Sequence, residues 1–547
     1  MKCIETALRW QGDEQWLAFS QKEKRAILAD LSQVFSVVRR NQKTGFATAG
    51  ELRSSVPELK SSVPDGLECM GVVPACEPSH LGSASFCEDH GAKAAYQTGA
   101  MANGIASEGM VTALGRAGFL ASFGSAGLPL NDLERSIRSI QSALPNGPYA
   151  FNLINTPQDP ELEARVVDLY LNYGVRTIEA AAFLDLSLPL VRYRATGLAR
   201  DEHDRVITRN KIMAKVSRRE LVEKFMMPPP ERLLAHLLEK AMISNEQASL
   251  ARDIPMADDI TIEADSGGHT DNRPLISLLP DTLAIRDQLQ ERLFYKRGVR
   301  IGVAGGISTP QSVLAAFMMG ADYVVTGSIN QSSREAGTSN HVKRQLAAAE
   351  LFDVMMAPSA DMFEMGVKVQ VLKRGSLFPM RAQKLYELYR SYDSWENLPS
   401  QERAKLEKQF FQKDFNAIWE EVIDFFQVRA PLVLKKAQVN PKFKMALVFR
   451  WYLGHASLWA IKGDPQRVLD YQIWCGPSMG AFNNWVKGSY LEQLENRSVV
   501  DIAHHLTAGA CYLYRAKLAK FLDSNLDLDL DRYIPEPLKE INNYEAR

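Results

Sequence analysis

From Tyr96 onward, short apolar runs rich in β-branched and aromatic residues alternate with segments that carry one apolar face at helical spacing. This alternation is typical of repeated β/α units around a parallel sheet. It predicts eight strands, at Tyr96–Met101, Phe119–Phe123, Tyr149–Leu153, Arg176–Ala180, Lys211–Val216, Asp259–Glu263, Arg300–Ala304 and Tyr323–Thr326. Eight such units in about 260 residues predict a TIM (β/α)8 barrel, and an open doubly wound sheet is the structural alternative.

One interval between predicted strands, from Val216 to Asp259, is too long for a single helix. It contains a segment of helical periodicity that follows a run of two methionines and three prolines at 226–230. We therefore expect a helical insertion after strand 5, at about residues 218–255.

We place the expected barrel at residues 69–345. On either side of it the sequence lacks the alternation of apolar runs and helical segments. Residues 1–68 predict an N-terminal helical and irregular segment, with a helix from Gln21 to Arg39 followed by a polar stretch. After about Gln345 the alternation ends, and residues 346–547 predict a helical C-terminal domain. The tryptophans at 451, 459, 474 and 485 favour packing within that domain, with a substrate or partner groove as the alternative.

The composition excludes several classes of protein. The 547 residues are 46% hydrophobic and 24% charged, which excludes a disordered or low-complexity chain. The formal net charge of −1 argues against a nucleic-acid-binding surface. The sequence has no run of about 18 apolar residues and no signal-peptide pattern, so we expect a cytoplasmic protein that does not enter a membrane. Six scattered cysteines without a Cys-x-x-Cys pair predict free thiols and no metal site.

Residues 300–330 carry the most informative pattern. A predicted strand runs into Gly305-Gly306, a helix opens at Thr309-Pro310, and the next strand ends at Gly327-Ser328. The ends of strands 7 and 8 of a barrel form a phosphate site, in which backbone amides at glycines point at the anion. The pattern therefore predicts a cradle for the phosphate of a cofactor, and two tight turns without a ligand are the alternative.

A histidine follows the sixth predicted strand. The strand ends at Glu263 and leads into Ser266-Gly267-Gly268-His269, on the face where barrel loops hold reacting groups. Two glycines allow the main chain to approach a flat ring, and a histidine can donate or accept a proton near neutral pH. The pattern favours a catalytic role for His269 as strongly as a structural one.

Three further strand ends carry candidate cofactor contacts. The first strand ends in Gly99-Ala100-Met101, where small residues let a planar ligand lie against the backbone. Asn152 ends the third strand, where an amide suits the polar edge of a ring, and Lys215 ends the fifth, where an ammonium suits negative charge. Taken singly, Asn152 and Lys215 are each better explained as an incidental polar group at a strand end, but as members of one ring of residues they indicate a binding site.

These segments resemble a known family of flavoenzymes. The sequence resembles the FMN-dependent barrel family of nitronate monooxygenases and flavin-type enoyl-acyl-carrier-protein reductases. The similar segments are QTGAM (97–101), Asn152, Lys215, SGGHT (266–270), AGGI (304–307) and TGS (326–328). Longer segments resemble the PfaD branch of this family, which comprises the stand-alone enoyl reductases of bacterial polyunsaturated fatty acid synthases. These segments are GAMANGIASE, ADSGGHTDNRPL, APSADMFEMGVKVQVLKRG and CGPSMGAFNNWVKGSYLE. The resemblance covers about residues 70–525.

The resemblance implies that FMN binds at the mouth of the barrel. The implied cofactor contacts are Gly99, Ala100, Met101, Asn152, Lys215, Gly268, Ala304, Gly305, Gly306, Gly327 and Ser328. The implied catalytic residues are His269, on the substrate side of the flavin, and Lys215, which would stabilise the reduced flavin. Asp271 stands where nitronate monooxygenases usually have a glycine. This departure and the long C-terminal region favour a reductase over a nitroalkane oxidase.

The implied activity is that of a trans-acting enoyl reductase. NADPH or NADH reduces FMN, and a hydride then passes to the β-carbon of a trans-2-enoyl thioester on an acyl carrier protein. His269 or water protonates the α-carbon, and Arg273 is a candidate contact for a phosphate of the nicotinamide cofactor or of the pantetheine arm. The implied partners are carrier domains of a polyunsaturated fatty acid or polyketide synthase. A homodimer of the chain is also compatible with the resemblance. The alternatives are a nitronate monooxygenase-type flavin oxidase and a non-catalytic assembly subunit.

Overall fold

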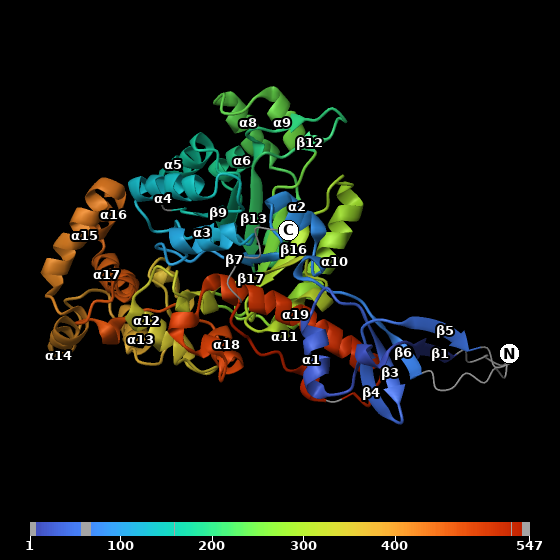
Figure 1. Cartoon of the computed structure of the whole chain (residues 1–547). Coiled ribbons are helices and arrows are strands. Elements are labelled where there is room, and N and C mark those ends of the chain that lie inside the picture. Colours follow the sequence, from blue (N-terminus) through green and yellow to red (C-terminus); the bar gives the residue numbers. More distant parts are fainter. Residues whose placement is uncertain (1–6, 56–66, 158, 527, 539–547) are drawn as a thin grey trace.

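A closed barrel of eight parallel strands lies at the centre of the computed structural model, which describes residues 7–55, 67–157, 159–526 and 528–538 (Figure 1). The barrel strands are β7 (Tyr96–Thr98), β8 (Leu120–Phe123), β9 (Ala150–Ile154), β10 (Thr177–Ala181), β13 (Lys211–Val216), β14 (Asp259–Glu263), β16 (Arg300–Ala304) and β17 (Tyr323–Thr326). The last strand pairs with the first, with Thr326 opposite Thr98, so the sheet closes on itself. The predicted TIM barrel is therefore confirmed, and the open sheet is excluded. The eight predicted strands are all present, although β7 ends at Thr98 and Gly99–Met101 belong to the loop that follows.

Helices surround the barrel (Figure 1). They include α3 (Glu108–Arg116), α4 (Leu130–Ala143), α5 (Pro160–Asn172), α6 (Leu188–Ala195), α7 (Arg219–Met226), α10 (Leu275–Leu293) and α11 (Pro310–Met318). On α4, Leu133, Ile137 and Ile140 are buried at the spacing of a single helix face. Thr309 caps α11 through a reciprocal capping box with Ser312, so this helix begins where the sequence predicted.

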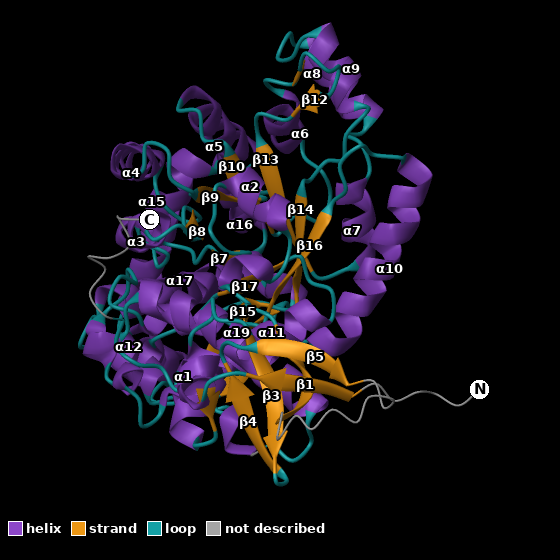
Figure 2. Cartoon of the chain, turned by 45° about the vertical axis from the view of Figure 1, so that its right-hand side comes forward, coloured by secondary structure: helices purple, strands orange, loops and turns teal. Residues whose placement is uncertain are grey.

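The long interval after β13 holds the predicted helical insertion. Beyond α7 it forms α8 (Glu231–Glu239) and α9 (Asn245–Ala251), whose bounds lie within residues 218–255. Both helices contact α6 and lie together at the top of the molecule (Figures 1 and 2). Leu234 and Leu237 of α8 are buried, so the insertion packs onto the outside of the barrel as part of its main core.

The N-terminal residues form an antiparallel β-sheet, which corrects the predicted helical and irregular segment (Figure 2). Its strands pair in the order β2-β4-β3-β6-β1-β5. They are β1 (Ala7–Gln11), β2 (Leu17–Ala18), β3 (Phe35–Arg40), β4 (Lys43–Ala47), β5 (Glu51–Ser55) and β6 (Leu67–Val73). An α-helix among them, α1 (Gln21–Ala29), starts at the predicted residue but ends well before Arg39.

The predicted helix from Gln21 to Arg39 is wrong over β3 because a hairpin competes for these residues. Val37 and Val38 are β-branched and fully buried in the sheet. Asn41 and Gln42 adopt φ angles of 49° and 65°, as the two central residues of a tight hairpin turn require. Residues 56–66 of the predicted polar stretch lie outside the described residues.

The C-terminal region is mainly helical, as predicted. Its helices are α12 (Asn340–Ala347), α13 (Phe378–Ser391), α14 (Ser400–Lys405), α15 (Phe415–Arg429), α16 (Pro431–Val439), α17 (Pro441–Lys462), α18 (Ser478–Val486) and α19 (Val499–Leu522). The expectation that strands end near Gln345 is wrong, because β18 (Val354–Pro358) and β19 (Lys368–Leu372) form a hairpin. The hairpin stands alone among long helices, without the repeated β/α alternation by which the barrel strands were predicted. The hairpin takes a third strand, β15 (Gly268–His269), from the loop after β14.

The C-terminal region shares contacts with the other parts of the chain. Trp451, Trp459 and Trp474 pack against a second hydrophobic core, as the packing interpretation predicted. Helix α19 packs against α11 of the barrel and against β6 of the N-terminal sheet. The domain boundaries at 69 and 345 therefore remain predictions.

The structure tests two further expectations, on membrane-spanning helices and on free cysteines, for the residues that it describes. Across the part of the chain that the structure describes, no helix has both the length and the apolar character needed to cross a bilayer. The cysteines at 69, 76, 87, 475 and 511 are free thiols, as expected. Cys3 lies outside the described residues.

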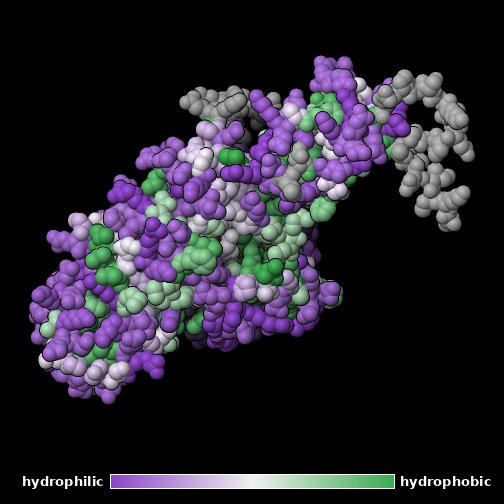
Figure 3. All heavy atoms as spheres, turned by 90° about the horizontal axis from the view of Figure 1, so that it is seen from below, coloured by the Kyte–Doolittle hydropathy of each residue, from purple (hydrophilic) through white to green (hydrophobic). Residues whose placement is uncertain are grey.

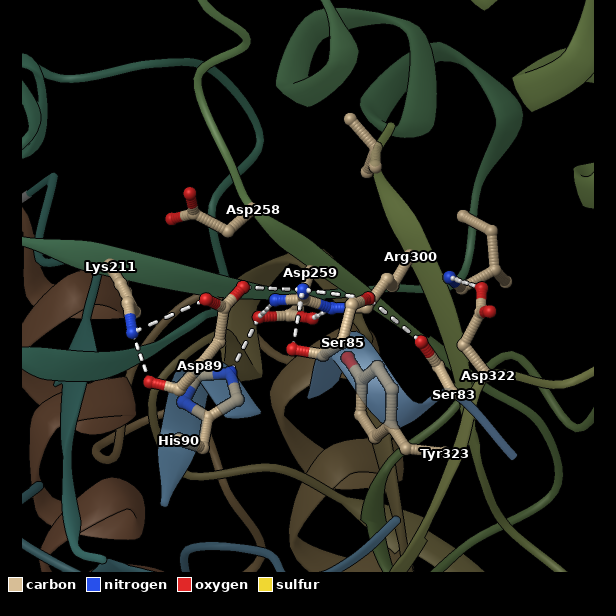
Figure 4. Close-up of polar contacts among 12 residues, drawn as sticks. Ser83, Ser85, Asp89, His90, Lys211, Asp258, Asp259, Arg300, Asp322 and Tyr323 are labelled. Atoms are coloured by element: carbon tan, nitrogen blue, oxygen red, sulfur yellow. Dashed lines mark hydrogen bonds and ion pairs between the residues drawn. The ribbon is translucent and has the colours of Figure 1, made fainter. Parts of the chain in front are cut away.

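A buried polar cluster lies at the amino ends of the barrel strands (Figure 4). Arg300 begins β16 and donates to both carboxylate oxygens of Asp259, the first residue of β14, at 2.5 and 3.0 Å. It also donates to Asp89 at 2.5 Å, and His90 Nε2 lies 2.8 Å from Asp259 Oδ2. Burial acts to lower the pKa of Arg300, but the two carboxylates outweigh it and raise this pKa. Because Asp89 and His90 belong to α2 (Ala84–His90), the cluster ties that helix to the barrel.

We expect Arg300→Met to lower the free energy of unfolding by about 3–5 kcal/mol, because it leaves buried carboxylates without their guanidinium. Urea unfolding followed by circular dichroism measures the change. The control is Arg135→Ala, which removes an exposed ion pair with Asp132 and is expected to cost less than about 1 kcal/mol. Equal losses in the two variants would show that the cluster does not stabilise the barrel.

Candidate active site

The carboxyl ends of three strands bring the predicted glycines together at one mouth of the barrel. Strand β17 lies between β16 and β7, and its last pair joins Thr326 to Thr98. The Gly99 amide donates to the Thr326 carbonyl at 2.9 Å. The loops that begin at Gly99, at Gly305-Gly306 and at Gly327 are therefore neighbours, as the sequence predicted.

The backbone at the ends of β16 and β17 is suited to hold the phosphate of a cofactor. Gly305 and Gly306 have φ angles of +88° and +75°, in the left-handed region that favours glycine. A Cβ added at Gly306 or at Gly327 would meet no atom within 4 Å, so the backbone there borders open space. Because α11 begins a few residues later at Pro310, an anion could approach this backbone closely.

Ala304 and Ser328 flank these glycines and already have partners. The Ala304 carbonyl accepts a hydrogen bond from the Ala264 amide at 2.8 Å. The Ser328 hydroxyl accepts one from the Gly476 amide at 3.0 Å, which links the end of β17 to the C-terminal region. That hydroxyl retains its own proton for a ligand.

Lys215 and Glu263 face each other from the neighbouring strands β13 and β14. The Lys215 Nζ lies 2.9 Å from Glu263 Oε1, and the two side chains are 19% and 18% exposed. Burial acts to lower the pKa of Lys215, but the charges of Glu263 and Glu179 outweigh it and raise this pKa. Lys215 is therefore a fixed ammonium at neutral pH.

Glu179 in β10 is a buried carboxylate that was not predicted from the sequence. Its side chain lies in the barrel, and the residue is 2% exposed. The Gln97 side chain donates to it at 2.9 Å, and the Ala100 amide donates to its two oxygens at 3.3 and 3.2 Å. A charged residue within the apolar run Thr177–Ala181 was the available signal.

Glu179 changes what the neighbouring predicted contacts can do. The Ala100 amide donates its hydrogen bond to Glu179, whereas the Met101 amide has no acceptor among the described residues. The Asn152 side chain donates to the Glu179 carbonyl at 3.0 Å, and Asn152 is 6% exposed. The Met101 amide is left available to a ligand, and Asn152 keeps its second side-chain N–H and its Oδ1.

An acidic residue of the C-terminal region contacts His269. His269 lies in β15 opposite Val369 of β19, and its Nε2 is 3.2 Å from Oδ1 of Asp361, in the loop between β18 and β19. Burial acts to lower the pKa of His269, but Asp361 outweighs it and raises this pKa. Burial acts in turn to raise the pKa of Asp361, yet His269 lowers it to about 2. The imidazole therefore keeps its proton to a higher pH than a free histidine, and its 47% exposed side chain is accessible.

The loop before His269 is fixed by residues from far along the chain. Gln370 Nε2 donates to Asp265 Oδ1 and to the Ser266 carbonyl, both at 2.7 Å. A Cβ on Gly267 would lie 2.8 Å from the Cys475 nitrogen, so the two backbones approach closely at this glycine. Gly267 thus makes room for the C-terminal segment, whereas the sequence had suggested that both glycines admit a flat ring.

The residues after His269 anchor the same loop on its other side. Asp271 accepts hydrogen bonds from Ser217 at 2.7 Å and from Arg218 at 3.2 Å, next to the start of α7. The Arg273 carbonyl accepts the Asp265 amide at 3.0 Å, while the Arg273 residue is exposed. Asp271 therefore fixes the loop to the barrel.

Comparisons with known proteins match both the C-terminal helices and most of the chain. A family model described as "[Acyl-carrier-protein] S-malonyltransferase, inserted helical domain" matches residues 392–471. A polyunsaturated fatty acid synthase subunit of Thraustochytrium sp. is 46% identical over 475 residues, which is 85% of this chain and 32% of that protein. "Polyketide biosynthesis protein PksE" of Bacillus subtilis is 44% identical over 450 residues, 82% of this chain and 58% of that protein. The chain thus spans less than two thirds of these curated relatives.

One solved structure is similar over its whole length. The crystal structure of the enoyl reductase domain of MlnA, from the macrolactin biosynthesis cluster of Bacillus amyloliquefaciens, is 42% identical with a TM-score of 0.77. The match covers 82% of this chain and 100% of that domain. With this identity over a complete domain of the same fold, the chain belongs to the family of the MlnA enoyl reductase domain.

Proposed function

We propose that the chain is a trans-acting enoyl reductase that reduces trans-2-enoyl thioesters on acyl carrier protein domains, with NADPH or NADH and FMN, in polyunsaturated fatty acid or polyketide biosynthesis. The proposal rests mainly on one arrangement, in which open glycine backbone, the Lys215 ammonium near the end of β13 and the His269–Asp361 pair belong to strand ends and loops around one barrel mouth. The names of the relatives support it, because they include an enoyl reductase domain and a polyunsaturated fatty acid synthase subunit.

FMN is the cofactor that these residues fit. The backbone of Gly305, Gly306 and Gly327 and the hydroxyl of Ser328 would hold its phosphate, and the Met101 amide and Lys215 would contact the rest of the cofactor. Bound FMN supplies hydride transfer between the nicotinamide and the β-carbon of the substrate. The chain supplies orientation and charge around that transfer.

Lys215 places a fixed positive charge in the site. Its contact with Glu263 holds the ammonium in position before any ligand arrives. Because its pKa is raised, Lys215 stays charged throughout the neutral range. A preorganised cation stabilises negative charge that develops beside it, which is the role we propose for this residue.

His269 is the proton donor to the α-carbon in this proposal. Asp361 raises the pKa of the imidazole, and the half-exposed ring is accessible to a substrate at the mouth. A positioned acid with a pKa near the operating pH contributes typically about 10²- to 10⁴-fold to a proton transfer. His269 is therefore preferred to water as the donor.

Asp361→Asn is expected to move the alkaline limb of the kcat profile to lower pH. Removing the carboxylate lowers the pKa of His269, so the imidazole loses its proton sooner as the pH rises. Turnover measured across the range from acid to alkaline pH gives the position of that limb. Asp361→Glu keeps the charge and is the control, which should shift the limb less. A limb that does not move in Asp361→Asn would show that this pair does not set the protonation of the donor.

The proposed activity is tested with protein loaded with FMN and given the crotonyl thioester of N-acetylcysteamine. An enoyl reductase forms the butyryl thioester and oxidises one nicotinamide cofactor for each product. A nitronate monooxygenase-type oxidase instead consumes oxygen with a nitronate and leaves the thioester unchanged. A non-catalytic assembly subunit does neither, and either of these results would contradict the proposal.

A further inference from the structure

One segment of the C-terminal region has an unusual charge. From Phe425 to Gly463, across the end of α15 and all of α16 and α17, the sequence contains seven lysines and arginines and no aspartate or glutamate. The whole chain has a formal net charge of −1, so this excess of positive charge is local. A local excess of one sign raises the concentration of oppositely charged partners near it.

Helix α16 displays part of this charge beside exposed apolar side chains. Leu432, Lys435, Lys436 and Val439 follow at spacings of three, one and three residues, so they share one face of the helix. Leu432 is 76% exposed and Val439 83% exposed, and both lysines are exposed. We call these four residues the α16 face. Ala437 is buried on the opposite side, where the helix packs against its neighbours.

The lysines around the α16 face differ in their contacts. Lys442 pairs with Asp393 at 3.0 Å, and the Lys444 Nζ lies 4.9 Å from the centre of the Trp419 ring, so these two belong to the packing of the region. The Lys436 Nζ lies 4.4 Å from the centre of the Phe443 ring, which orients it without neutralising its charge. Lys435 has no acidic partner within the described ranges.

The α16 face lies at the periphery of the molecule. Helices α15 and α16 form the left end of the chain, away from the N-terminal sheet (Figure 1). In the space-filling view from below, most of the surface at that end is hydrophilic, with hydrophobic side chains interspersed (Figure 3). Aliphatic side chains this exposed contribute little to the stability of the fold. A partner that covers them would therefore be stabilised by burying their apolar surface.

We propose that the α16 face docks the acidic surface of the carrier-protein domain that presents the enoyl thioester, an inference that rests on the proposed function. Charge complementarity carries it, because two exposed lysines in an acid-free segment attract an acidic surface while Leu432 and Val439 give it apolar contact. The family model that matches residues 392–471, which include α16, describes a helical domain of an enzyme named for a carrier protein. A nine-residue helix with two exposed aliphatic residues offers little to a membrane, which favours a protein partner.

The test compares a carrier-bound substrate with a soluble one. Lys435→Glu/Lys436→Glu is expected to raise KM for crotonyl carrier protein about 10- to 100-fold, and to leave kcat and the KM for crotonyl N-acetylcysteamine unchanged. The control, Lys240→Glu/Lys296→Glu, makes the same change in net charge at exposed lysines elsewhere and should leave both KM values unchanged. Leu432→Ser should raise KM for the carrier-bound substrate alone. Unchanged KM values in the α16 variants would overturn the proposal.

Binding measured without turnover separates this inference from the proposed function. Calorimetric titration of the chain with crotonyl carrier protein should show binding that weakens with salt and that Lys435→Glu/Lys436→Glu removes. Such binding without enoyl reduction would refute the proposed activity and leave the docking face supported. A wild-type dimer that the variant dissociates, seen by analytical ultracentrifugation, would assign the face to a second copy and overturn the proposal. Binding to phosphatidylserine vesicles that the variant loses would assign it to a membrane and overturn it equally.

Discussion

His269→Ala is expected to leave FMN bound and to lower turnover by about 10²- to 10⁴-fold, because it removes the acid that delivers the proton to the α-carbon. Cofactor binding should persist, since the glycine backbone and Lys215 come from other strands. The measurements are the flavin content of the purified variant and its kcat with an enoyl thioester.

A second histidine gives the control for this variant. His203 lies exposed in a loop between β11 (Ala199–Arg200) and β12 (Val206–Ile207), and His203→Ala should change neither flavin content nor kcat. If His269→Ala lost its flavin but kept its turnover per bound flavin, the histidine would be a cofactor contact and not the donor.

Gly306→Asp is expected to weaken FMN binding by about 100-fold or more. The added carboxylate would enter the open space above the backbone, where the phosphate is proposed to bind, and like charges in contact cost several kcal/mol. Fluorescence titration of the cofactor-free variant with FMN measures the dissociation constant.

Gly91→Asp is a matched control at the other end of the barrel. Gly91 also has a left-handed φ, +64°, and a Cβ there would likewise meet no atom within 4 Å. Both variants therefore carry the same backbone cost, of about 1–2 kcal/mol. Equal FMN affinity in the two variants would place the phosphate elsewhere.

The barrel could be predicted from sequence because each of its units is local. A short apolar run and the helix after it fall within a few tens of residues, and Pro310 and Gly327 mark where elements begin and end. The N-terminal sheet was missed because its pairing is not local. Apart from the β3–β4 hairpin, its strand order joins segments that are distant in sequence, such as β3 with β6 and β1 with β5, and no short window shows these pairs.

In the candidate site, too, local features could be predicted from the sequence and long-range contacts could not. Strand ends such as Lys215 and Gly305 were found because a barrel gathers its strand ends at one mouth. Asp361 was missed because it reaches His269 across 92 residues, from a hairpin whose strands were not predicted. Glu179 was missed because its partners are a side chain and a backbone amide of another strand's end, which no spacing along the chain reveals.

Anaerobic stopped-flow spectroscopy of the FMN-loaded chain tests the proposed activity most directly. We expect NADPH or NADH to bleach the flavin absorbance, and crotonyl carrier protein then to restore it with formation of the butyryl thioester. A reduced flavin that the enoyl thioester leaves bleached, and that only oxygen reoxidises, would contradict the assignment of this barrel mouth as an enoyl reductase site.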